Sequence, residues 1–216
     1  MAAEEINITL KKTTLQGNLA IPKNPKGLVI FSHGSGSSRF SPRNNFVTDI
    51  LQSRRMGTLL FDLLTEQEDS LYQNRFDIHK LTARLIQTTQ WIHQSVSISK
   101  LPLGYFGAST GAASALRAAA FFGNSINAVV SRGGRPDLAL DELDQVKAPT
   151  LLLVGGLDTE VIWLNQKAYD RLDCPKKMEI VAGASHLFEE PGKLETVAES
   201  AGDWFDTWFK KAKEHV

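Results

Sequence analysis

Apolar residues follow two different patterns along the chain, and the pattern changes near Gly27. Before it, apolar and polar positions alternate over residues 6–10 and again over residues 15–21. Alternation with a period of two is typical of a strand with one exposed face. Because the two segments are close together, they predict an antiparallel hairpin at the edge of a larger sheet.

After Gly27 the apolar residues form short continuous runs without alternation. These runs are 27–34, 57–64, 101–107, 126–134, 148–156 and 177–183. Such runs are typical of strands that are buried on both faces. Most of them end at a glycine, which predicts that a turn or loop follows.

Helix-length segments separate these runs. They cover residues 46–55, 76–93, 110–122, 160–172 and 195–213. Strands that alternate with helices indicate a parallel sheet covered on both sides. No internal repeat or linker interrupts the pattern, so we expect a single α/β domain over residues 1–216.

The segment "GASTG", Gly107 to Gly111, stands where a buried strand should turn into a helix. It matches the pattern G-x-S-x-G, whose sharp turn exposes the serine hydroxyl and admits only small neighbours. Ser109 is therefore the candidate nucleophile. The alternative is a glycine-rich helix start in which Ser109 only caps the helix.

A serine hydroxyl needs a base to become a nucleophile. His186 follows the last predicted strand and precedes the last helix, at the sheet edge where Ser109 is expected, so it is the candidate base. His33 lies in the loop after the first parallel strand. The remaining histidines lie in a polar helical segment or in the tail: His79, His93 and His215.

The base needs an orienting carboxylate, and two aspartates follow predicted strands. Asp158 follows the penultimate strand, and the order Ser109, Asp158, His186 is that of α/β-hydrolases. Asp137 follows the strand before it and is the alternative acid.

An acyl-transfer site also needs two donors for the oxyanion, usually backbone N–H groups. The N–H of Thr110, just after Ser109 at a helix start, is the first candidate. The second is the N–H of Ser35 in the loop "FSHGSGSSRF", although that loop could also be an ordinary Gly/Ser turn.

The overall composition excludes some partners. Lys+Arg and Asp+Glu both number 24, so the zero net charge does not point to nucleic acid or an anionic membrane. The first residues lack the apolar core of a signal peptide, and no apolar run approaches the roughly 20 residues of a membrane span. We expect a cytoplasmic protein.

The lone cysteine, Cys174, cannot form an internal disulfide and is interpreted as incidental.

These motifs together resemble the α/β-hydrolase superfamily, and most closely its small dienelactone-hydrolase-like branch. Ser109 in "GASTG", Asp158 in "GGLD", His186 in "GASHLF" and the loop "HGSGSS" carry the resemblance. It implies an eight-stranded, mostly parallel sheet with an antiparallel second strand. The chain is also similar to hydrolase domains sometimes fused to phosphoribosyltransferases, a similarity that carries no established substrate. Dienelactone hydrolases proper use a cysteine nucleophile, so the serine here indicates ester hydrolysis.

Only residues 135–147 stand where many relatives insert a lid, so we expect no lid domain and a small, short-chain substrate. The expected reaction is ester cleavage through an acyl-enzyme, which needs no metal or organic cofactor. An acyltransferase with the same triad and a non-catalytic binding protein remain alternatives.

Arginines are frequent near the predicted sheet edge. Arg132 and Arg135 follow the strand next to that of Ser109, and guanidinium groups suit a carboxylate or phosphate. An anionic small-molecule substrate would explain them. The alternatives are that they are solvated, or neutralised by the acidic residues 66–69.

Overall fold

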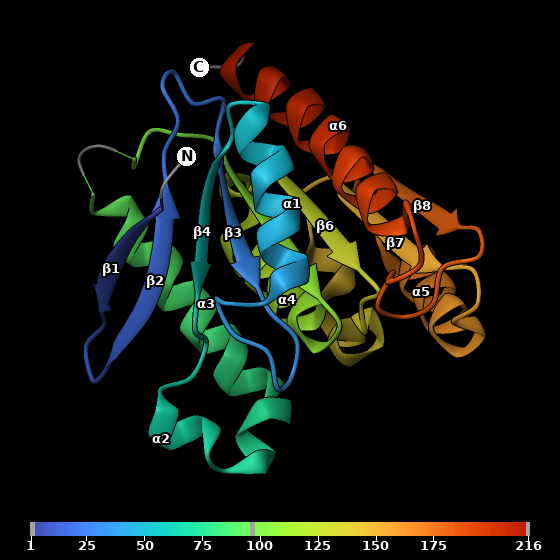
Figure 1. The fold of residues 1–216 in the computed structure, drawn as a ribbon, viewed down its shortest axis with the longest axis horizontal. Coiled ribbons are helices and arrows are strands. Elements are labelled where there is room, and N and C mark those ends of the chain that lie inside the picture. The colour runs from blue at the N-terminus through green and yellow to red at the C-terminus, as the bar shows by residue number, and fades with distance from the viewer. Residues whose placement is uncertain (1–2, 96–97, 215–216) are drawn as a thin grey trace.

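The computed structural model describes residues 3–95 and 98–214, and eight strands in this part of the chain form one sheet (Figure 1). They are β1 (Glu4–Thr9), β2 (Thr14–Ala20), β3 (Leu28–Ser32), β4 (Gly57–Phe61), β5 (Leu103–Ala108), β6 (Ala128–Arg132), β7 (Thr150–Gly155) and β8 (Lys176–Val181). Their spatial order is β1-β2-β4-β3-β5-β6-β7-β8. β2 pairs antiparallel with β1 and β4, and the other pairs are parallel. The predicted sheet is thus confirmed.

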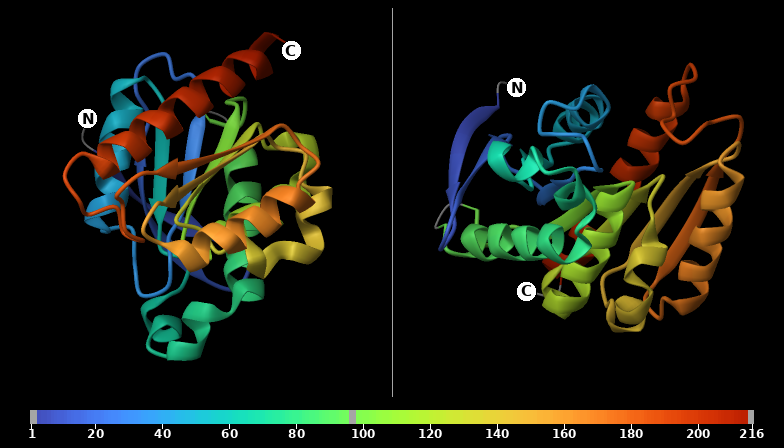
Figure 2. Two further views of the ribbon diagram at one scale, coloured as in Figure 1. Left: turned by 90° about the vertical axis from the view of Figure 1, so that its right-hand side faces the viewer. Right: turned by 90° about the horizontal axis from the view of Figure 1, so that it is seen from below.

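Helices cover both faces of the sheet. The longer ones are α1 (Pro42–Ser53), α3 (Ile78–His93), α4 (Thr110–Phe122), α5 (Thr159–Arg171) and α6 (Lys193–Glu214). α1 and α6 pack together on one face, whereas α3, α4 and α5 lie on the other (Figure 2, right). None of the helices in the described part of the chain is long and apolar enough to cross a membrane.

The sheet buries one apolar cluster on each face. Val130 and Phe205 belong to the cluster under α1 and α6, and Leu116 and Val129 belong to the cluster under α3 and α4. All residues of the strands from β3 to β7 are buried, as their continuous apolar runs predict. β8 departs from that prediction, because it lies at the sheet edge and most of its residues are partly or fully exposed.

Short helical segments fill connections that the apolar pattern left open. They are α2 (Glu66–Asp69) and the 3₁₀ segments η1 (Tyr72–Phe76), η2 (Gly123–Ser125) and η3 (Pro136–Gln145). η3 is the whole β6–β7 connection apart from a few loop residues, and it packs against α4 and α5. In the described part of the chain no lid domain stands there, which agrees with the prediction.

The turn from β5 into α4 brings backbone atoms unusually close together. A Cβ on Gly111 would lie 2.1 Å from the carbonyl oxygen of Ser32, and one on Gly107 would lie 2.5 Å from Cα of Ala112. Neither neighbour can move aside, because each belongs to the backbone of a packed element. Glycine at these two positions is what allows the chain to reverse at Ser109.

We expect Gly111→Ala to lower the free energy of unfolding by about 3 kcal/mol, the upper range for forcing atoms into a packed site. Helix propensity alone would favour alanine there, so the loss would come from the contact with Ser32. Urea unfolding measures it. Gly123→Ala is the control, since its Cβ meets no atom within 4 Å and only its positive φ opposes alanine, at about 1 kcal/mol, the low end for one strained residue. An equal loss in both variants would contradict the close-approach account.

Candidate active site

Ser109 lies at the tip of the β5–α4 turn in a strained backbone conformation. Its φ is 50° and its ψ is −123°, a combination that non-glycine residues adopt rarely and at a cost. Its N–H donates to the carbonyl of Arg132 at 3.2 Å, and its own carbonyl accepts from the N–H of Arg135 at 3.0 Å. The side chain makes no capping hydrogen bond to α4. The helix-cap alternative for Ser109 is therefore wrong.

His186 and Asp158 meet at the same edge of the sheet. The Nδ1 of His186 lies 2.6 Å from Oδ2 of Asp158, and the two side chains are 38% and 16% exposed. A carboxylate only accepts, so Nδ1 is the protonated nitrogen and Nε2 keeps its lone pair. Asp158 precedes α5 without capping it, because its carboxylate is directed to His186.

The backbone after β6 connects the candidate base to the candidate nucleophile. Arg132, which holds the N–H of Ser109, is followed by Gly133 with φ 51°. A Cβ on Gly133 would lie 3.0 Å from the carbonyl oxygen of His186 and 3.6 Å from its ring carbon Cε1. The two loops are thus packed so closely that His186 and Ser109 share one small region.

Asp137, the alternative acid, is engaged elsewhere. Its carboxylate accepts two hydrogen bonds from the guanidinium of Arg135, at 2.8 Å each. This pair raises the pKa of Arg135, with burial opposing it. The structure therefore gives His186 the carboxylate of Asp158, and Asp137 neutralises Arg135.

The loop after β3 packs directly on the nucleophile turn. A Cβ on Gly34 would lie 3.1 Å from Cβ of Ser109, so glycine allows the close approach. The N–H of Ser35, the expected second oxyanion donor, donates to Oγ1 of Thr110 at 2.9 Å. The N–H of Thr110 stands in the first turn of α4, where backbone N–H groups lack partners within the helix. The N–H of Thr110 thus has no partner within the helix, whereas the N–H of Ser35 already donates to the Thr110 side chain.

The side chain of His33 supports this loop through hydrogen bonds. It is buried, its Nδ1 lies 2.9 Å from the carbonyl of Gly34, and its Nε2 accepts from the N–H of Leu63 at 3.1 Å. Both bonds require the neutral ring with a proton on Nδ1. Burial lowers the pKa of His33, whereas the bond to Gly34 and the nearby carboxylates of Asp62 and Asp69 act in the opposite direction. The sequence placed His33 in a loop without assigning this role.

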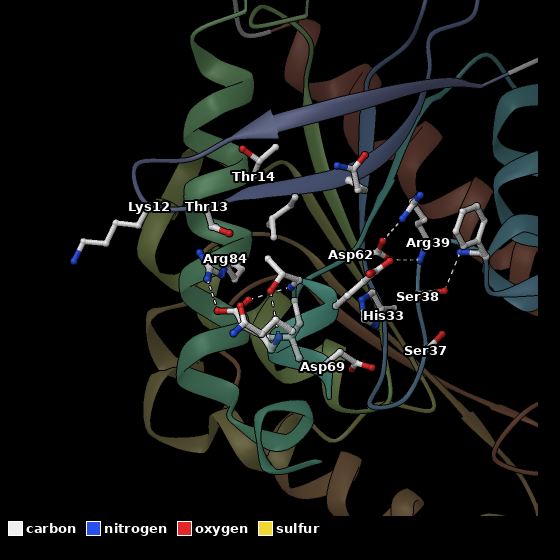
Figure 3. A pocket seen from close by; sticks show the side chains of 18 residues that line it. Lys12, Thr13, Thr14, His33, Ser37, Ser38, Arg39, Asp62, Asp69 and Arg84 are labelled. Carbon is white, nitrogen blue, oxygen red and sulfur yellow. Dashed lines mark hydrogen bonds and ion pairs between the residues drawn. The ribbon is translucent and has the colours of Figure 1, made fainter. Parts of the chain in front are cut away.

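A cavity of about 1030 Å³ is lined in part by the same loop, including Ser37 and Arg39 (Figure 3). His33 contributes to its wall, but neither Ser109 nor His186 does. Two ion pairs lie in its wall, because Arg39 binds Asp62 and Arg84 binds Glu68.

The acidic segment that lines this cavity pairs with other arginines than Arg132 and Arg135. Glu68 binds Arg84 at 2.6 Å, and Asp69 binds Arg75 at 2.7 Å. The alternative that residues 66–69 neutralise Arg132 and Arg135 therefore has no support in these contacts.

Solved structures and known sequences share this architecture. The dienelactone hydrolase of Anabaena variabilis matches with a TM-score of 0.93 and 47% identity, over 96% of this chain and 99% of its own. Est1E of Butyrivibrio proteoclasticus matches with a TM-score of 0.82 and 16% identity, over 95% of this chain and 99% of its own, and so shares the fold.

Among curated sequences, a Mycobacterium tuberculosis protein that carries the provisional name of a phosphoribosyl transferase is 51% identical over 202 residues. The match covers 94% of this chain and 46% of that protein, so the chain spans about half the length of the curated relatives it matches. No family model matches the chain.

Because the hydrogen bonds of His33 require its neutral ring, we expect their contribution to stability to depend on pH. Its folded pKa lies below the ordinary 6.5, so its stabilisation is complete above that value and is lost as the pH falls through the lowered pKa. We expect His33→Gln to be less stable than the wild type by about 1–3 kcal/mol at pH 8, from the lost hydrogen bonds. This difference should shrink toward pH 4 in urea unfolding.

The two proteins differ only at residue 33, so the comparison isolates the contribution of the imidazole. A difference that stays constant from pH 8 to pH 4 would show that the ring does not titrate between the folded and unfolded states.

Proposed function

This chain belongs to the dienelactone hydrolase family of α/β-hydrolases, and on that basis we propose that it is a serine hydrolase that cleaves an ester-type bond of a small substrate. The observation that carries the proposal is the 2.6 Å pair of His186 and Asp158 beside the strained turn of Ser109. A carboxylate-bound imidazole near a partly exposed serine is the arrangement that nucleophilic acyl transfer requires.

In the proposed reaction, Nε2 of His186 takes the proton of the Ser109 hydroxyl while Oγ attacks the ester carbonyl. The tetrahedral intermediate collapses, the alcohol leaves with the proton from His186, and an acyl group remains on Ser109. His186 then takes a proton from water, which attacks the acyl-enzyme and releases the acid. Every proton that moves is accepted and returned by His186, so this cycle uses the chain's own residues.

Asp158 has a supporting role in this cycle. Its carboxylate fixes the tautomer of His186 that leaves Nε2 free, and it stabilises the imidazolium that forms during attack. Its side chain is mostly buried, so solvent screens this interaction less than it would at an exposed site.

The oxyanion would be bound by the N–H groups of Thr110 and Ser35. The N–H of Ser35 points to Oγ1 of Thr110 in the free chain, and we propose that it turns to the oxyanion as this forms. Catalytic hydrogen bonds are often incomplete before substrate binds. Before substrate binds, the hydroxyl of Thr110 would hold the loop of Ser35 in place.

The proposed substrates have short acyl chains. η3 is packed against α4 and α5 and leaves no described segment to cover the site. Because each buried CH₂ contributes about 0.8 kcal/mol, an uncovered site gains little from a long chain.

We expect Ser109→Ala to lower the kcat for p-nitrophenyl acetate by about 10⁴-fold or more, because the nucleophile is lost. The melting temperature should not fall, since the side chain makes no cap. Ser70→Ala is the control, because this exposed serine after α2 lies outside the candidate active site, and it should keep the wild-type rate. Wild-type turnover by a folded Ser109→Ala protein would remove Ser109 as the nucleophile.

Asp158→Asn should lower kcat by about 10⁴-fold, because an amide at this position favours the wrong tautomer of His186. Asp137→Asn removes a carboxylate of the same kind that bonds only Arg135, and its kcat should change less than tenfold. Steady-state kinetics of both variants decide between the acids. A collapsed rate for Asp137→Asn with a near-normal rate for Asp158→Asn would reverse the assignment.

A further inference from the structure

One buried arginine beside the candidate active site has no partner of opposite charge. Arg132, the last residue of β6, is 7% exposed. Its Nε and Nη1 atoms are buried without a hydrogen-bond partner. No carboxylate of the described residues forms an ion pair with it. Other arginines of the described chain have such a partner: Arg39, Arg54, Arg75, Arg84, Arg117, Arg135 and Arg171.

An unpaired buried charge is costly, and proteins normally pair it or leave it in water. Burial, together with like-charge repulsion from Arg43, lowers the pKa of Arg132 to about 10. The group therefore still carries its proton at neutral pH. A retained charge with unused donors indicates a site for an anion that the free chain lacks.

The position of Arg132 ties this charge to the candidate catalytic residues. Its carbonyl holds the N–H of Ser109 at 3.2 Å, and the next residue, Gly133, packs against His186. Side chains alternate along a strand, so Arg132 shares the face of Val130, whose cluster lies under α1 and α6. The end of β6, the start of α1 and the loop before α6 converge there, at the lower edge of the sheet in Figure 1.

Arg43 brings a second guanidinium to this place. It stands in the first turn of α1, close enough to Arg132 to lower the pKa of that group. Its Nη1 binds Glu189 at 2.8 Å, whereas its Nε is buried without a partner. Glu189 is 61% exposed, so the carboxylate that binds Arg43 is largely solvated. The N-terminus of α1 adds a partial positive charge to the same side.

We propose that Arg132 and Arg43 bind a phosphate group on the substrate, so that the chain hydrolyses short acyl esters of phosphorylated molecules. A phosphate monoester carries a charge of about −1.5 to −2 at pH 7 and three acceptor oxygens. It can therefore accept from two guanidinium forks at once, whereas a carboxylate has only two oxygens and one charge. The proposal deepens the hydrolase function above and rests on it for the reaction.

The pairing also changes which arginines are assigned to the substrate. The sequence pointed to Arg132 and Arg135 together. Because Asp137 accepts from Nε and Nη2 of Arg135 and neutralises its charge, Arg43 takes its place in the proposed site.

The test uses inorganic phosphate as the probe and the full chain as the protein. Binding is measured by isothermal titration calorimetry at constant ionic strength. We expect Arg132→Gln and Arg43→Gln each to raise the Kd for phosphate tenfold or more, since a charge-assisted hydrogen bond of about 1.5–3 kcal/mol is lost. Arg135→Gln and Arg171→Gln remove paired arginines and should change the Kd less than twofold.

Folding of each variant is checked by circular dichroism, because Arg132 is buried. If Arg132→Gln does not fold, Arg132→Lys keeps the charge without the planar fork, and Arg43→Gln tests the same site from a partly exposed position. Acetate at the same ionic strength should bind at least tenfold more weakly than phosphate. Equal binding of acetate would overturn the assignment to phosphate.

Calorimetry does not depend on turnover, so the two proposals can fail separately. Phosphate binding that both arginine variants weaken, in a chain without ester turnover, supports the anion site and refutes the hydrolase function. Ester turnover by a chain whose phosphate affinity is the same in the wild type and in both variants overturns the anion site and leaves the hydrolase function standing.

Discussion

The close approach of β3 to the start of α4, across the end of β5, is the contact on which the site depends. Gly111 lies so near the carbonyl of Ser32 that any side chain would overlap it. A helix that begins this close to the sheet forces residue 109 into φ 50°. The strain is maintained because the backbone of Ser109 is bonded to Arg132, at the end of β6, and to Arg135 in the connection that follows. The surrounding packing offsets the free-energy cost of this strained backbone conformation. The hydroxyl of Ser109 is thereby held at the edge of the sheet.

The distribution of charge follows a similar logic. In most of the described chain each guanidinium is neutralised nearby, as Arg135 is by Asp137 and Arg39 by Asp62. His33 stays neutral because burial opposes its charge. The loop of Ser35 is therefore supported by an uncharged imidazole. Against this background the unpaired Arg132 is an exception. Its own carbonyl accepts from the N–H of Ser109, and the next residue, Gly133, packs against His186.

Much of this could be predicted from the sequence. Continuous apolar runs predicted the inner strands, and the ends of those strands located the residues at the active edge, because parallel strands deliver their carboxyl ends to one side. α1 begins at Pro42, four residues before the predicted start, because Ser41 caps it while the first apolar residue is Phe46. α2, η1 and η3 carry no clear apolar period and depend on caps and packing.

The partners of side chains could not be predicted in the same way. Arg132 and Arg135 look equivalent in the sequence, yet one is buried and unpaired and the other is bound to Asp137. Which of two nearby arginines meets a carboxylate depends on strand register and loop geometry. For the same reason the hydrogen bond from Ser35 to the hydroxyl of Thr110, which occupies an expected oxyanion donor, had no signal in the sequence.

If the His186–Asp158 pair makes Ser109 nucleophilic, a reagent that reacts covalently with activated serines should modify Ser109. The folded chain is treated with a fluorophosphonate, digested, and mapped by mass spectrometry. We expect one adduct, on Ser109, which is absent when the chain is unfolded in urea before treatment. A folded chain that takes up no label, or takes it up on another serine with Ser109 unmodified, would contradict the account.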